Sequence, residues 1–408
     1  MVKMNTRSVL NRFSKLFLLM IIPTVMIYSV FMLDYPLIWW PIEGYFLYLA
    51  FKLRDRGFDP GPLKFFLLCV FVSFVYGVFM SSTYWHWKQL VGNIMIFMMP
   101  LIAYMFSDPD KNAYVLNYWY RHAPIIILCI LPFAEMSHFY GRIMQPFTLL
   151  LLFFPLIKKK YRKIALIALV LSLTLGFSDR SDNIRLICCA ILGLISCSRF
   201  KALLQSWIKR LTIVLLISPI IFFILGMTGT FNILDIGKEM GWKQNVETAA
   251  GATKDIFSDT RTGLYVEVIK SAVKNDYSVF GRSLARGYDT YFFRGLISKS
   301  LGFDYSERGA SETAILNIFT YMGIVGVILA YWVFGNASIK AVFRSNNYYI
   351  SLVGLYLAFR WSYCWVEEYQ KFDYSYIFLW IIVGMCMSEK FRVMDDDEFK
   401  EYAAELTK

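Results

Sequence analysis

The first residues that could do chemistry form a polar run, Ser178-Asp179-Arg180-Ser181-Asp182-Asn183-Ile184-Arg185, between two apolar segments. If both segments cross a membrane as helices, this run dips into the outer part of the bilayer. Charged groups cost about 2.5 kcal/mol or more at membrane depth and usually face a cavity or a partner there. Arg180 and Arg185 are therefore candidate functional residues. The alternative is a hairpin turn in which the charges pair with each other.

A second group consists of arginines in or beside the polar segment 230–310. Its members are Arg261, Arg282, Arg286, Arg294 and Arg308. The planar guanidinium fork binds two oxygens at once, which suits a diphosphate, and nearby glycines let the backbone approach a ligand. The alternative is that these arginines form structural ion pairs with the acids of the same segment. Those acids are Asp259, Glu267, Asp289 and Glu307.

Two further ionisable residues lie next to or inside apolar segments. Glu312 directly precedes the apolar run that begins at Thr313, and a carboxylate desolvated there can act as a general base. The alternative role for Glu312 is to cap the start of a helix. Arg360 falls within an apolar segment, where it either binds substrate or pairs with Glu367 or Glu135 to fix helix packing.

The elements that must position these residues are membrane helices. The chain has 408 residues, of which 57% are hydrophobic and only 18% charged, a composition unlike that of soluble domains. Apolar runs predict an all-α polytopic membrane protein with about twelve transmembrane helices. The predicted spans are 14–33, 35–51, 64–80, 89–106, 123–140, 144–157, 164–178, 186–198, 211–229, 311–333, 347–366 and 373–389.

The positions of lysine and arginine predict the orientation of these spans. Most of them fall on one side if the spans alternate, so we expect both termini in the cytoplasm. The net charge of +12 is then a topology signal, and nucleic acid is not an expected partner. This divides the chain into helices one to nine (1–229), a large, partly helical extracytoplasmic loop (230–310), helices ten to twelve (311–389) and a cytoplasmic tail (390–408).

Cysteine and histidine positions argue against disulfides and metals. All seven cysteines lie in apolar runs, which does not fit a disulfide framework. The histidines His86, His122 and His138 share no metal-ligand spacing. We therefore expect neither a metal nor another cofactor.

The order of motifs in the second half of the chain resembles the Wzy-type O-antigen polymerases, members of the O-antigen polymerase and ligase family. A polar turn, Ser178-Asp179-Arg180-Ser181, precedes a span. The large loop carries an arginine with an aromatic residue four positions later, Arg261 and Tyr265, and then the aromatic-glycine motif Phe280-Gly281-Arg282. A helix with Glu312 at its mouth and Gly323 and Gly326 downstream follows. The ligases carry histidine where this chain has Glu312.

The resemblance implies a glycosyltransferase of bacterial lipopolysaccharide biosynthesis, with a fold similar to GT-C-type enzymes, in the inner membrane and with its active site facing the periplasm. Its substrates would be glycans on undecaprenyl diphosphate, and a chain-length regulator protein would be a partner. Arg180, Arg261 and Arg282 would neutralise charge on the leaving diphosphate, and Glu312 would accept the acceptor's proton. Arg185, Arg286, Arg294, Arg308 and Arg360 would bind diphosphate or glycan.

Two alternatives remain at this point. One is the ligase that transfers finished glycan to lipid A-core. The other is a transporter, a lipid-linked oligosaccharide flippase, which would also have intramembrane charges. Flippases often have repeated halves and usually lack one dominant loop, and no such repeat is present here.

Overall fold

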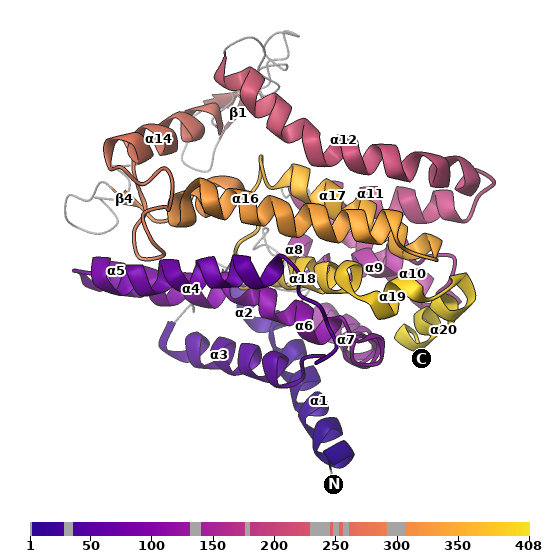
Figure 1. The fold of residues 1–408 in the computed structure, drawn as a ribbon. Helices are drawn as coiled ribbons and strands as arrows, with labels where there is room; N and C mark the ends of the chain where they lie inside the picture. The colour runs from indigo at the N-terminus through magenta and orange to yellow at the C-terminus, as the bar shows by residue number, and fades with distance from the viewer. Residues whose placement is uncertain are drawn as a thin grey trace.

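The structure is a computed structural model that describes residues 2–27, 36–130, 140–175, 180–228, 245–247, 253–255, 261–291 and 307–408. Figure 1 shows a bundle of helices, several of them lying nearly side by side. The strands of the described residues form two short antiparallel pairs, β1 with β2 and β3 with β4. The all-α class predicted from the sequence is confirmed.

The helices before the large loop are α1 (Val2–Leu19), α2 (Ile21–Ile27), α3 (Pro36–Lys52), α4 (Leu63–Met80), α5 (Tyr84–Phe97), the 3-10 turn η1 (Met99–Leu101), α6 (Ile102–Phe106), α7 (Pro109–Ile130), α8 (Tyr140–Met144), α9 (Phe147–Leu152), α10 (Lys159–Leu175), α11 (Arg180–Ser196) and α12 (Lys201–Met227). The loop contains β1 (Asn245–Glu247), β2 (Thr253–Asp255), α14 (Arg261–Lys274), β3 (Tyr288–Asp289) and β4 (Glu307–Arg308). After it come α16 (Ala314–Phe343), α17 (Tyr348–Tyr363), α18 (Tyr374–Met387), α19 (Glu389–Val393) and α20 (Asp396–Leu406).

Several helices have the length and composition to cross a membrane. Within the described residues there are five, Thr6–Val25, Leu63–Met80, Tyr84–Phe106, Lys201–Met227 and Ala314–Phe343, and Tyr374–Met387 is a shorter apolar helix. Large apolar side chains of α12, among them Val214, Ile221 and Ile224, are exposed on the outside of the bundle. An exposed apolar face of this kind is what a lipid-facing helix presents. The structure therefore supports a membrane protein, and the number twelve stays a prediction.

Some predicted spans differ from the observed helices. Within the predicted span 144–157, the helical part is α9, which Gln145 and Pro146 separate from the end of α8 at Met144. Proline lacks a backbone N–H and interrupts helical hydrogen bonding, and the carbonyl of Pro146 accepts a hydrogen bond from the Tyr120 hydroxyl at 2.8 Å. Helix α7 begins at Pro109, well before the predicted start of its span at residue 123.

The two ends of the bundle carry different parts of the chain. Lys390 contacts Asp55 at 2.7 Å and Asp108 at 3.4 Å, and Lys201 contacts Asp396 at 3.6 Å. These contacts gather the lysine- and arginine-rich connections around α19 and α20, at what we call the tail end. Helix α14 and strand β4 lie at the opposite end, which we call the loop end (Figure 1). Which membrane side each end faces stays a prediction.

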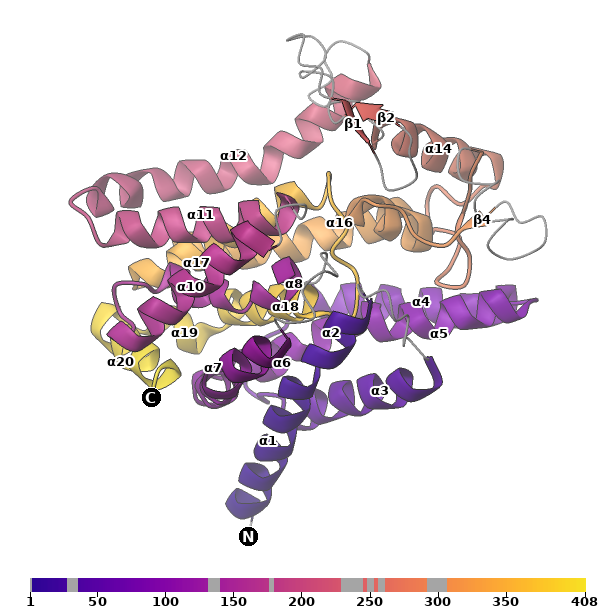
Figure 2. The same ribbon diagram turned by 180° about the vertical axis from the view of Figure 1, so that it is seen from behind.

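Helix α18 lies at the centre of the bundle. All of its side chains are buried, and it packs against α6, α16 and α17. Seen from behind, α10, α11 and α12 lie on one side of this group (Figure 2). At the loop end, α18 begins at its N-cap residue Asp373, which accepts a hydrogen bond from the backbone N–H of Tyr376 at 3.0 Å. Any polar side chain near Asp373 is therefore held in the middle of the protein.

Helix α16 is broken at Gly323, and a loop segment fills the break. Gly323 has φ 63° and ψ −162°, which is not helical. The carbonyl of Thr320 accepts from the backbone N–H of Arg282 at 2.7 Å, and Ile324 donates to the carbonyl of Ser278 at 2.9 Å. These two bonds replace the one that Ile324 and Thr320 would share in a continuous helix. The motif Phe280-Gly281-Arg282 thus fixes the loop to a membrane helix.

Candidate functional site

Two arginines of the loop, Arg282 and Arg286, bind carboxylates of the same loop. Arg282 donates to Asp289 at 2.8 Å and lies 3.3 Å from Glu307. The Nε of Arg286 donates to both carboxylate oxygens of Glu307, at 2.9 and 3.1 Å, and its Nη2 also donates to Oε1. Bidentate pairs of this kind are specific and strong. The alternative considered from the sequence, structural ion pairing, is what the structure shows for these two arginines.

Acid is expected to loosen this part of the loop through Asp289. Burial alone would raise the pKa of Asp289, but hydrogen bonds from Arg282, Asn275 and Lys274 outweigh it and lower the pKa below its ordinary 3.8. The ionised carboxylate therefore stabilises the loop above the unfolded pKa, and this stabilisation is lost as the pH falls through the lowered folded pKa. The protection of residues 271–289 against hydrogen exchange, relative to the intrinsic exchange rate at each pH, should fall below about pH 4.

The matched variants for this prediction are Asp289→Asn and Asp276→Asn. Asp276 is an exposed neighbour with a left-handed backbone (φ 55°) that asparagine also adopts. Asp289→Asn should give fast exchange at neutral pH already, and Asp276→Asn should keep the acid dependence of the unchanged protein. Equal exchange in all three proteins at every pH would show that the carboxylate does not hold the loop.

Arg308 and Glu312 form a third pair at the mouth of α16. Glu312 accepts from Arg308 Nη2 at 3.1 Å, and Arg308 Nη1 donates to the Tyr288 hydroxyl at 3.2 Å. The Glu312 side chain is 53% exposed, so the desolvation expected from the sequence is not observed. Glu312 is not the N-cap of α16 either, since that position is Thr313. A catalytic role for Glu312 stays a prediction.

A second group of charges is buried at the loop end. This buried charge cluster consists of Arg142, Asp182, Arg185, Arg360 and Asp373, from α8, α11, α17 and the start of α18, with Arg360 and Arg142 both close enough to Arg185 to interact with it electrostatically. Arg142 lies 3.2 Å from both Asp182 and Asp373. Arg185 pairs with Asp182 and donates to the Ser375 hydroxyl at 2.6 Å. Buried charges are costly unless they are paired and hydrogen-bonded, as these four are.

Arg360 is the exception in this cluster. It is only 1% exposed, yet its Nε and Nη2 have no hydrogen-bond partner among the described residues. Its guanidinium lies over the ring of Tyr369, 5.7 Å from the ring centre. The cluster holds three arginines against two aspartates. A buried guanidinium with unused donors in a positively charged cluster is suited to bind an anion.

Charged residues on the connection between α17 and α18 form a rim on one side of the cluster, where Glu367 and Glu368 interact electrostatically with its members. Arg261, the first residue of α14, donates to Glu367 at 3.1 Å. One turn later, the Tyr265 hydroxyl donates to the carbonyl of Trp365 at 2.6 Å. The backbone N–H of Ala314, at the start of α16, donates to the carbonyl of Glu367 at 3.1 Å. The arginine-aromatic motif at the start of α14 therefore fixes the loop to the rim of the buried charge cluster.

The connection between α17 and α18 carries two glutamates, Glu367 and Glu368, whose pKa values are raised. Burial raises the pKa of Glu367, although Arg261 opposes the shift. Burial likewise raises the pKa of Glu368, although Lys371 and Arg142 oppose it. Carboxylates with raised pKa values beside a site for anions are candidates for acid–base chemistry.

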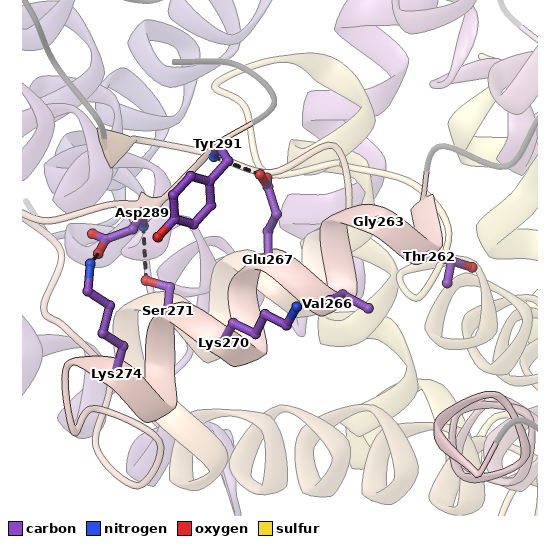
Figure 3. Close-up of a pocket in the computed structure, with 9 residues that line it drawn as sticks. All are labelled: Thr262, Gly263, Val266, Glu267, Lys270, Ser271, Lys274, Asp289 and Tyr291. Atoms are coloured by element: carbon purple, nitrogen blue, oxygen red, sulfur yellow. Dashed lines mark hydrogen bonds and ion pairs between the residues drawn. The ribbon is translucent and has the colours of Figure 1, made fainter.

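Two cavities flank α14. An apolar groove of about 400 Å³ lies between α12, α14 and the end of α17, and its lining includes Phe222, Phe223, Tyr265, Trp365 and Val366. A second pocket, of about 520 Å³, lies along α14 and strand β3. In this pocket, Glu267, Ser271 and Lys274 point toward Asp289 and Tyr291 (Figure 3). Thr262 and Val266 line both cavities, so the two meet along one helix.

The predicted site residues thus divide into three groups. Arg185 and Arg360 meet in the buried charge cluster, and Arg261 lies on its rim. Arg282, Arg286, Arg308 and Glu312 belong to the ion pairs of the loop. Arg180 is exposed at the start of α11, and Arg294 lies outside the described residues.

Three charged residues of this site, Arg142, Asp373 and Glu368, were not predicted from the sequence. Their signal was present, since each charge directly borders an apolar segment. It was weak because many charges border membrane helices for reasons of topology. In the part of the chain that the structure describes, no group of three or more histidine, cysteine, aspartate or glutamate residues could hold a metal ion.

Comparison with known proteins found no relative of this chain. No protein-family model, no curated protein and no solved structure matches it. The function is therefore inferred from the chemistry of the site, together with the order of motifs in the sequence.

Proposed function

We propose that this protein is a polymerase of the bacterial inner membrane that joins oligosaccharide repeat units carried on undecaprenyl diphosphate into O-antigen or a related surface polysaccharide. The observation that carries this proposal is Arg360, buried in a positively charged cluster with two donor atoms unused among the described residues. A diphosphate supplies the acceptor oxygens that such a guanidinium lacks.

The proposed reaction is a glycosyl transfer between two lipid-linked substrates. A hydroxyl on the terminal sugar of the acceptor attacks the anomeric carbon of the donor glycan, and the bond from that carbon to the diphosphate oxygen breaks. Negative charge grows on the leaving diphosphate, where Arg360 stabilises it with support from Arg185 and Arg142. Electrostatic stabilisation of developing charge is usually the largest single contribution to catalysis. The leaving group is already activated, so a nucleotide sugar is not needed.

The surroundings of the cluster suit an amphipathic substrate. The apolar groove between α12 and α14 would take the first isoprene units of a polyprenyl chain, since aromatic and aliphatic side chains line it. The pocket along α14 and β3 would take sugars of the glycan, since Glu267, Lys270 and Asp289 are among its lining residues. In this arrangement, α14 separates the lipid from the carbohydrate. The chain-length regulator is proposed as a partner because of the family resemblance alone.

The experiment that tests the proposal is reconstitution. The purified protein is placed in liposomes with lipid-linked repeat units from the native host, without nucleotide sugar and without ATP. We expect a ladder of longer lipid-linked glycans on a gel, and none in liposomes without the protein.

Other products would identify the alternative functions. Transfer of glycan only when lipid A-core is added would indicate the ligase. Movement of labelled substrate across the bilayer without any ladder would reject the polymerase and indicate a flippase, for which a broken helix such as α16 is also typical.

A further inference from the structure

We infer that Glu368, rather than Glu312, is the general base that removes the proton from the acceptor hydroxyl. This inference rests on the proposed glycosyl transfer and names the residue that activates its nucleophile. Glu368 lies on the connection between α17 and α18, at the rim of the buried charge cluster.

The contacts of Glu368 leave its carboxylate available. Its Oε1 lies 3.4 Å from Asn317 Nδ2, and its Oε2 lies 3.4 Å from Lys371 Nζ. Charge-assisted hydrogen bonds are usually about 2.7–2.9 Å long, so both contacts are loose. Glu307 of the loop is instead gripped by Arg286 through several short bonds. A base needs a free lone pair for the incoming proton, and Glu368 has one.

The position of Glu368 links the base to the proposed diphosphate site. Arg142 donates to the backbone carbonyl of Glu368 at 3.4 Å through Nη2, while its Nη1 holds Asp373. The same Arg142 contacts Asp182, the partner of Arg185. One arginine therefore ties the backbone that carries the base to the cluster that would hold the leaving group.

The environment of Glu368 also tunes its acidity. Its side chain is 17% exposed, enough to meet a substrate, and burial raises its pKa toward the range where a base works best. The titratable and charged groups that face it are Lys371, Arg142, Asp373 and Tyr321. Glu312, by comparison, is 53% exposed and held by Arg308.

The proposed step balances without a further reactant. The acceptor oxygen forms a bond to the anomeric carbon while its proton passes to the Glu368 carboxylate. The bond from the anomeric carbon to the diphosphate oxygen breaks, and its electron pair leaves with undecaprenyl diphosphate. Glu368 then returns the proton to water.

The test compares Glu368→Gln with two other glutamate-to-glutamine variants in the reconstituted assay. Glu368→Gln should lower kcat by about 10²- to 10⁴-fold with little change in KM, since glutamine keeps the shape but accepts no proton. Glu368→Asp, which keeps the carboxylate, should retain intermediate activity. Glu401→Gln on the exposed face of α20 is the matched control and should behave like the unchanged protein.

Glu312→Gln separates the two candidate bases, because we expect it to lose far less activity than Glu368→Gln. The pH dependence gives a second readout. The kcat of the unchanged protein should fall as the pH drops through the raised pKa of Glu368, and the residual activity of Glu368→Gln should lack this acid limb.

Four results would contradict different parts of this scheme. A full ladder from Glu368→Gln, or a larger loss in Glu312→Gln, would overturn the assignment of the base and leave the polymerase intact. An unchanged acid limb in Glu368→Gln would also overturn it. The absence of any ladder from the unchanged protein would overturn the proposed function itself.

Discussion

Replacing Arg360 with methionine is expected to abolish glycan polymerisation without harming the fold. Removing a residue that stabilises developing charge typically costs about 10²- to 10³-fold in kcat. Arg360 is buried, and two of its donor atoms lack partners among the described residues, so an apolar side chain of similar length removes a desolvation cost. The melting temperature in detergent should stay the same or rise, while the ladder disappears.

Arg185→Met is the matched control for this prediction. Arg185 is equally buried, but it pairs with Asp182 and donates to Ser375. Arg185→Met removes the bonds to Asp182 and Ser375, and Asp182 keeps Arg142 as its charged partner, so the loss of these buried hydrogen bonds costs about 1–3 kcal/mol. Arg185→Met should therefore lower the melting temperature. If Arg360→Met is destabilised as much as Arg185→Met, then Arg360 has a structural role and the site for the diphosphate is wrong.

The second large effect is expected from an added methyl group where the loop meets the broken helix. A Cβ at Gly281 would lie 2.3 Å from the backbone nitrogen of Met322, and a Cβ at Gly323 would lie 2.2 Å from the carbonyl oxygen of Val279. Both glycines also have positive φ, 79° and 63°, which side chains disfavour. Gly281→Ala and Gly323→Ala should each separate the loop from α16. Loss of monodisperse protein and a strongly lowered melting temperature would be the readout.

Gly335→Ala provides the control on the same helix. A Cβ at Gly335 would meet nothing within 4 Å. Alanine in a helix interior is favoured over glycine by about 0.5–1 kcal/mol, so this variant should be as stable as the unchanged protein or more stable. Normal melting of Gly281→Ala or Gly323→Ala would show that the loop can be held without the close backbone contact.

The sequence predicts site residues well where a charged side chain must be buried at a cost in free energy. It predicts them poorly where the role of a charged side chain depends on its ion-pair partners in the folded protein. Arg360 was selected because an arginine inside an apolar segment must have a reason to be there, and the structure places it in the buried charge cluster. Arg282 was also predicted as a ligand for the diphosphate because it is an arginine. Its role is set by its ion pairs with Asp289 and Glu307, and the spacing of residues along the sequence does not show which charges pair in the folded protein. Arg142 was missed because a charge beside a short apolar run looks like a topology signal.

The motifs were easier to locate than to interpret. Arg261 and Tyr265 begin α14 and fix it to the connection between α17 and α18, where the sequence analysis had assigned Arg261 to the diphosphate. Phe280-Gly281-Arg282 fills the break in α16. A glycine beside an arginine predicts a close backbone approach, but it does not tell whether the approaching group is a ligand or another part of the chain.

The shared hydrogen bonds between the loop and α16 also constrain how this protein is made. The N–H of Ile324 and the carbonyl of Thr320 have partners in residues 278–282, which are synthesised earlier. In a bilayer, each unsatisfied backbone group costs several kcal/mol. A freshly inserted α16 is therefore incomplete until the loop has folded back onto it. Docking of the loop must come before maturation of the helix, so a loop that fails to dock would leave a kinked, unstable span for cellular quality control to remove.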